Sequence, residues 1–184
     1  MRSSILTSIL CFFLLSGVLA QSPRDGHMEG RTYVNTYFHF AYVLPKILEA
    51  YDTSSLIFDQ SKPSDYEFLL FSARQGSEPH GLVMLAEKLN VPTPHSRGIK
   101  DAKDFLDKVA MFSPEQHAVM QPRKHFTNAD GLVIDELDYT ENGVPSSAVV
   151  TQIGQFLIVF KCDAGSAANL AEMTASIAAL HIRK

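Results

Sequence analysis

The feature that most constrains the fold of this chain is a series of turn signals in its second half. Asn128-Ala129-Asp130-Gly131, Asn142-Gly143 and Gly154 follow one another closely, and each separates two runs of strand-forming residues. Asn-Gly is a strong hairpin signal because both central residues of such a turn need a positive φ. The sequence therefore predicts four consecutive antiparallel strands, over residues 119–126, 132–139, 146–153 and 155–161.

Two helices are predicted on either side of this meander in the chain. Asp101 is placed to cap the first, in which apolar residues recur at three- and four-residue steps. The second, rich in alanine, is expected from about Ser166 to Leu180, and its buried stripe would hold Leu170, Thr174, Ile177 and Ala178. Strands and helices do not alternate regularly. We therefore predict an α+β fold, a mostly antiparallel sheet flanked by two main helices.

Shorter patterns precede the first helix. From Phe38 to Leu44 every second side chain is large and apolar, the period of a strand. Pro45 is expected to end this strand. Two compact apolar runs, residues 66–73 and 82–86, indicate a hairpin with a long tip. Residues 52–65 are expected to form a long surface loop held by three apolar side chains, Leu56, Ile57 and Phe58.

Residues 1–20 have the composition of a signal peptide. Arg2 supplies a positive charge, and the apolar run over residues 5–15 is shorter than the roughly 20 residues of a membrane-spanning helix. Val18 and Ala20 have the spacing that a signal peptidase requires. We predict cleavage after Ala20 and a periplasmic or secreted protein that does not span a membrane once it is cleaved.

The rest of the chain has the size and composition of one unit. We predict a polar, flexible leader over residues 21–31 and a single domain over residues 32–184. With 16 Lys and Arg against 20 Asp and Glu, the chain lacks the basic surface that nucleic acid requires. After cleavage Cys162 is the only cysteine, so no internal disulfide can form. No Asn-x-Ser/Thr acceptor occurs, which favours a bacterial periplasm or exterior.

No residue pattern marks a catalytic, cofactor or metal site. No serine lies in a Gly-x-Ser-x-Gly setting, and there is no glycine-rich phosphate loop. Cys162 continues the apolar face of Phe156, Ile158 and Phe160, which predicts a buried, inert thiol rather than a nucleophile. The histidines show no pair at metal-ligand spacing: His27, His39, His80, His95, His117, His125 and His181.

Two polar groups remain as candidates. Asp135, Glu136 and Asp138 form the densest acidic cluster, and on a strand Glu136 and Asp138 share a face that excludes Asp135. A solvated face, with Asp135 hydrogen-bonded near a sheet edge, is favoured over a hydrolase that uses two carboxylates. The loop from His95 to Arg97 is the best placed for anion binding, since Arg97 can bind a carboxylate or phosphate; an ordinary solvated loop is favoured there too.

The order of elements and four short segments resemble the PsbP-like family. The segments are YVNTYFHFAYVLP from Tyr33 to Pro45, DAKDFL from Asp101, Asp138-Tyr139, and GQFLIVF from Gly154 to Phe160 followed by the terminal helix. The resemblance implies an α/β/α sandwich around an antiparallel sheet. This fold is shared by photosystem extrinsic subunits, a Ran-binding nuclear-transport protein and periplasmic DcrB-like proteins. Most of these proteins act by docking onto other proteins. The chain departs from the photosynthetic members in lacking a recognisable calcium- or manganese-binding histidine set.

These observations favour an exported, non-enzymatic interaction or accessory module with an unknown protein partner and no cofactor. The alternative is a carrier of a small apolar ligand or lipid, in which the apolar trio of the long loop would cover a pocket. A carboxylate-dependent hydrolase that uses Asp135 or Glu136 is the third hypothesis.

Overall fold

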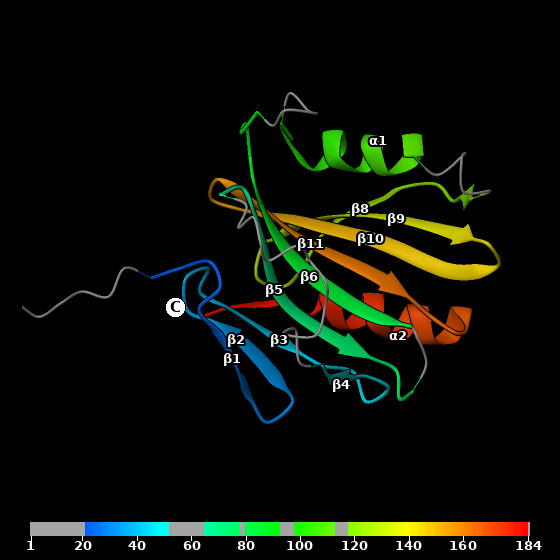
Figure 1. Ribbon diagram of the computed structural model, residues 1–184, viewed down its shortest axis with the longest axis horizontal. Helices are drawn as coiled ribbons and strands as arrows, with labels where there is room; N and C mark the ends of the chain where they lie inside the picture. The colour runs from blue at the N-terminus through cyan, green and yellow to red at the C-terminus, as the bar shows by residue number, and fades with distance from the viewer. Residues whose placement is uncertain (1–20, 52–64, 78–79, 93–97, 113–117, 184) are drawn as a thin grey trace, which may run out of the picture.

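The computed structural model describes residues 21–51, 65–77, 80–92, 98–112 and 118–183. Within these ranges the chain forms two antiparallel sheets and two helices (Figure 1). The predicted signal peptide, the long loop with its apolar trio, and the segment from His95 to Arg97 lie outside the described residues. None of the described helices is both long enough and apolar enough to cross a membrane.

The larger sheet confirms the predicted meander. Its strands run in the order β4-β5-β6-β11-β10-β9-β7, and β8 also pairs with β9. Their bounds are β4 Glu49–Ala50, β5 Glu67–Arg74, β6 Gly81–Lys88, β7 Val119–Met120, β8 Lys124–Thr127, β9 Val133–Glu141, β10 Val144–Ile153 and β11 Phe156–Asp163. At the β9–β10 turn, Asn142 and Gly143 have φ values of 51° and 83°, as the Asn-Gly signal predicts.

The strand predicted over residues 119–126 is divided in two. β7 and β8 both pair with β9, and the residues between them include Pro122. Proline has no N–H to donate to a sheet and is confined to edges and interruptions. The outer strand of the sheet therefore bends between Met120 and Lys124.

A second, smaller sheet was not predicted. It has the order β1-β2-β3-β12, with bounds β1 Gly26–Glu29, β2 Thr32–Asn35, β3 Phe40–Val43 and β12 His181–Ile182. The expectation of a flexible leader over residues 21–31 is therefore wrong, because β1 lies inside it and pairs with β2. The sequence of β1 is polar and lacks an alternating apolar pattern, so its stability comes from backbone pairing and from Met28, which packs on the core.

The two helices cover opposite faces of the larger sheet (Figure 1). α1, Ala102–Phe112, packs on β9 and β10, while α2, Ala167–Ala178, packs on β10, β11 and β3 and shares its layer with the smaller sheet. Leu170 and Ile177 are buried as predicted, whereas Met173 replaces Thr174 as the central contact of α2. The predicted α+β sheet flanked by two main helices is confirmed.

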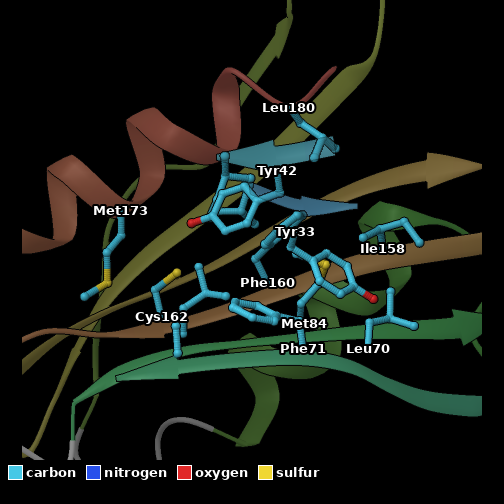
Figure 2. Packing of buried hydrophobic residues seen from close by; sticks show 14 of the residues in the cluster. Tyr33, Tyr42, Leu70, Phe71, Met84, Ile158, Phe160, Cys162, Met173 and Leu180 are labelled. Carbon is cyan, nitrogen blue, oxygen red and sulfur yellow. The ribbon is translucent and has the colours of Figure 1, made fainter. Parts of the chain in front are cut away.

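Each face of the larger sheet has its own apolar core. The cluster toward α2 and the smaller sheet contains aromatic side chains from both sheets, among them Tyr33, Tyr42 and Phe160 (Figure 2). The cluster toward α1 contains Leu106 and Val159. Because β6 and β11 contribute to both clusters, their sequences are apolar along most of their length, whereas β10, which also contributes to both, contains buried serines and a threonine.

Candidate functional site

An open groove of about 800 Å³ lies beside the first turns of α1, and we call it the α1 groove. Four parts of the chain form it: the start of α1, β8 with the residue before it, the β8–β9 turn with the start of β9, and the β10–β11 turn. Its lining residues are Asp101, Ala102, Lys103, Leu106, Arg123, His125, Gly131, Leu132, Val133, Asp135, Gln152 and Gly154.

Local hydrogen bonds fix the walls of the α1 groove. Asp101 caps α1 as predicted, since its Oδ1 accepts a 2.8 Å hydrogen bond from the backbone N of Asp104. The Asp104 carboxylate in turn accepts a hydrogen bond from the backbone N of Lys100, the residue before the cap. In the opposite wall, Asn128 Oδ1 accepts from the backbone N of Asp130 and of Leu132, both at 3.0 Å. Both walls are therefore held by hydrogen bonds between residues that are close in the chain.

The rim of the α1 groove is charged. His125 Nδ1 lies 2.8 Å from Asp135 Oδ1 across the β8–β9 pairing. Arg123 donates a 2.6 Å hydrogen bond to Asp107, which also accepts one of 2.8 Å from Lys103. These two hydrogen bonds, that from Lys103 first, lower the pKa of Asp107. The rim thus presents both signs of charge, already arranged in pairs.

The floor of the α1 groove is apolar. Ala102, Leu106 and Leu132 contribute to it, and Val133 is 46% exposed, one of the few large apolar side chains on the described surface. None of the described lining residues is Ser, Thr or Cys. The lining therefore offers contact area and ion pairs, and it offers no hydroxyl or thiol nucleophile beside His125.

The structure separates the acidic cluster as the alternation predicts. Asp135 points to the α1 side and is hydrogen-bonded at the sheet edge, which confirms the interpretation favoured for it. Glu136 and Asp138 share the opposite face, but the expectation that this face is solvated is wrong: Glu136 is 4% exposed. This face lies under α2, and Lys124 of β8 compensates the buried charge: its Nζ donates to Glu136 Oε1 at 2.7 Å and to Asp138 Oδ2 at 2.6 Å.

Electrostatics on this face are set by burial and by Lys124. Burial raises the pKa of Glu136, although the hydrogen bond from Lys124 opposes that rise. Burial also acts to raise the pKa of Asp138, but hydrogen bonds, led by that from Lys124, more than offset it and the pKa is lowered. The two carboxyl groups are thus held by one ammonium group, and Lys124 and Asp138 line a small pocket of about 270 Å³ against α2.

Cys162 lies where its register predicts. It is 1% exposed within the core cluster that holds Phe156, Ile158 and Phe160, and Figure 2 shows it among the apolar side chains. Burial raises the pKa of its thiol well above the usual range. Among the described residues, no three His, Cys, Asp or Glu side chains are grouped so that they could hold a metal ion.

His125 is the member of the site that sequence reasoning missed. Its neighbours in the chain carry no signal, but the turn centred on Asp130 does. Counting outward from that turn in an antiparallel hairpin places His125 opposite Asp135 and Lys124 opposite Glu136, as observed. The register of the predicted hairpin therefore suffices to predict both the His125–Asp135 and the Lys124–Glu136 pairs.

A helix on one face of a large antiparallel sheet, with a helix and a smaller sheet on the other, defines an α/β/α sandwich of the PsbP-like fold. No protein-family model and no curated protein sequence matches the chain. Among solved structures, it is similar to the cyanobacterial PsbP protein, CyanoP, from Synechocystis sp. PCC 6803. The TM-score is 0.56 over 85% of this chain and 98% of that chain, at 15% sequence identity. This similarity confirms the predicted fold and shows the fold alone.

Proposed function

We propose that the protein is an exported accessory module that binds a polypeptide segment of a partner protein in the α1 groove and performs no catalysis. The observation that carries this proposal is the lining of the groove, an apolar floor around the exposed Val133 inside a rim of paired charges. Protein-binding surfaces combine an apolar centre with a polar rim in this way. The PsbP-like resemblance supports it, since most relatives in that fold act by docking.

The arrangement of ionisable groups supports docking over turnover. The His125–Asp135 pair has no serine, threonine or cysteine beside it in the described lining. Glu136 and Asp138 both accept hydrogen bonds from Lys124, and carboxyl groups bound to an ammonium group in this way are poorly placed to exchange protons with a substrate. We therefore assign a structural role to Glu136 and Asp138, and a place in the charged rim of the groove to the His125–Asp135 pair.

Site-specific photocrosslinking in the native host tests the docking site. A photoreactive residue at Val133 should give one discrete adduct, whereas the same residue at Ala175, on the exposed face of α2, should not. Adding His125→Ala, which removes the rim pair with Asp135, should weaken the Val133 adduct. The same adduct from both positions, or an adduct indifferent to His125→Ala, would contradict docking in the α1 groove.

Export is part of the proposal and is supported by the sequence of residues 1–20 alone. The intact mass of the protein recovered outside the cytoplasm should match a chain that begins at Gln21, with or without the loss of ammonia by which an N-terminal glutamine cyclises. Recovery of the uncleaved chain from the cytoplasm would contradict it and would leave the docking proposal to stand on the crosslinking result.

A further inference from the structure

A shallow, open pocket of about 300 Å³ lies between the two sheets, and we call it the inter-sheet pocket. β1 and β2 of the smaller sheet form one wall, and the β4–β5 edge of the larger sheet forms the other. Six of its lining residues carry the argument: Gly26, Met28, Tyr33, Tyr51, Leu70 and Phe71. The cavity is far from the α1 groove in the fold, because it lies on the α2 face of the larger sheet.

A β-bulge builds the floor of the inter-sheet pocket. Leu69 pairs with Leu85 and Phe71 with Met84, so Leu70 is an extra residue in β5. Consecutive residues of a regular strand point to opposite faces, but Leu70 and Phe71 both belong to the core cluster toward the smaller sheet (Figure 2). Bulges re-aim side chains and are frequent beside functional sites.

Aromatic side chains form the walls. The rings of Tyr33 and Phe71 lie 4.9 Å apart at an angle of 32°. Tyr51 is held at the rim by the Arg74 guanidinium, 4.6 Å from its ring centre, and by its backbone N, which donates to Ser72 O. Met28 supplies a thioether, which packs well on rings. The surroundings therefore suit a flat apolar group.

Tyr33 supplies a hydroxyl proton that no residue in the described part of the chain accepts. Tyr33 is 2% exposed, and its oxygen accepts a 3.2 Å hydrogen bond from Asn35 Nδ2. The Asn35 amide meets the Tyr33 hydroxyl with its Nδ2, a donor, while its Oδ1 accepts from the backbone N of Phe38. The hydroxyl packs against Gly26, which lines the pocket beside it: a Cβ at position 26 would lie 2.0 Å from the hydroxyl oxygen, a clash that glycine avoids.

We propose that the inter-sheet pocket binds a small molecule with a flat apolar body and one hydrogen-bond acceptor, which receives the Tyr33 proton. A buried donor without an acceptor is costly, so a bound acceptor would remove that cost. The volume is at the lower end of small-molecule sites, which indicates a ligand of one or two rings. This activity is additional to the proposed docking function and does not depend on it.

Acetophenone and ethylbenzene are matched probes, because both carry one ring with a two-carbon substituent and only acetophenone has an acceptor. Titration of the isotope-labelled full chain, followed by NMR, should show acetophenone shifting the resonances of Met28, Tyr33 and Leu70. Tyr33→Phe should weaken acetophenone binding roughly five-fold and leave ethylbenzene binding within about two-fold, the effect of one hydrogen bond. Tyr37→Phe, a half-buried tyrosine outside the lining, is the control and should change neither.

Ala50→Phe provides a second variant, because Ala50 is exposed in β4 and lines the pocket, so the larger side chain should block it without disturbing the core. Both probes should lose affinity. Absence of acetophenone shifts at millimolar concentration would overturn the proposal, as would equal losses of both probes in Tyr33→Phe or undiminished binding in Ala50→Phe. Thermal unfolding of each variant confirms that it is folded.

Discussion

Lys124 Nζ donates a 2.7 Å hydrogen bond to Oε1 of Glu136, and the two partners differ sharply in burial: the Lys124 side chain is 54% exposed and that of Glu136 is 5% exposed. The same ammonium group lies 2.6 Å from Asp138 Oδ2. One cation on the surface thus compensates two acids beneath it. Removing the cation would leave buried negative charge with no counterion.

Lys124→Met should therefore destabilise the protein by about 2 kcal/mol at neutral pH, less than for a fully buried pair because Lys124 is partly solvated. Urea unfolding measures the change. The double variant Lys124→Met with Glu136→Gln should recover much of the loss, since the uncompensated charge is then reduced. Lys103→Met, which breaks an exposed pair with Asp107, is the control and should cost less than about 0.5 kcal/mol. A similar cost for both lysines would contradict the burial argument.

Glu87 should make stability depend on pH. Burial, followed by the charge of Glu67 directly across the β5–β6 pairing, raises the pKa of Glu87 to about 7; Asp104 adds to this, and Lys108 and Lys161 oppose it. A carboxyl group whose pKa is higher in the folded state stabilises the fold while it is protonated. Its contribution is fully present below about pH 4.5 and is lost as the pH rises through about 7.

The matched comparison is Glu87→Gln, which keeps the shape and removes the titration. The unfolding free energy of the wild type minus that of Glu87→Gln should fall by about 1 kcal/mol from pH 4.5 to pH 8, a value reduced from the full shift because Glu87 is partly exposed. A constant difference for Glu87→Gln across this range would refute the assignment.

The parts of the fold that follow from sequence are those set by short-range chemistry. The turn at Asn142 and Gly143, the caps at Asp101 and Ser166, and the apolar periodicity of the helices act within a few residues, and all are observed. The smaller sheet escapes such reasoning because it joins β1 near the start of the chain to β12 at its end. Neither strand has an apolar pattern of its own, so only the folded chain shows that they share a sheet.

The same division applies to the sites. The face shared by Glu136 and Asp138 follows from strand alternation, but its counterion is Lys124, twelve positions before Glu136, and its cover is the distant α2. His125 could be placed from the hairpin register. The inter-sheet pocket could not, because it depends on the bulge at Leu70 and on the contact between the hydroxyl of Tyr33 and Gly26. A site between two sheets can be predicted only when the packing of both sheets is known.

Gly143 occupies a turn position whose backbone conformation favours glycine. Its φ of 83° is a conformation that side chains with a Cβ rarely adopt, although no atom lies within 4 Å of the position that a Cβ would take. Gly143→Ala should therefore cost about 1 kcal/mol through backbone strain alone. Gly165→Ala is the control, because its φ is not in the left-handed region and its nearest contact, His80 Cδ2, would be at an ordinary 3.5 Å. Equal effects in thermal unfolding would argue against backbone strain as the cause.

Cys162 should be chemically silent in the folded protein. Alkylation requires a thiolate that the reagent can reach, and here the thiol is 1% exposed in the core and burial raises its pKa well above the usual range. Native protein treated with iodoacetamide at pH 8 should react at least about a thousand-fold more slowly than protein in urea, because reaction must await unfolding. The destabilised variant Lys124→Met should react faster than wild type in proportion to its loss of stability. Rapid labelling of the native chain, or a rate unaffected by that variant, would show instead that the thiol is reached through a local opening between α2 and β11.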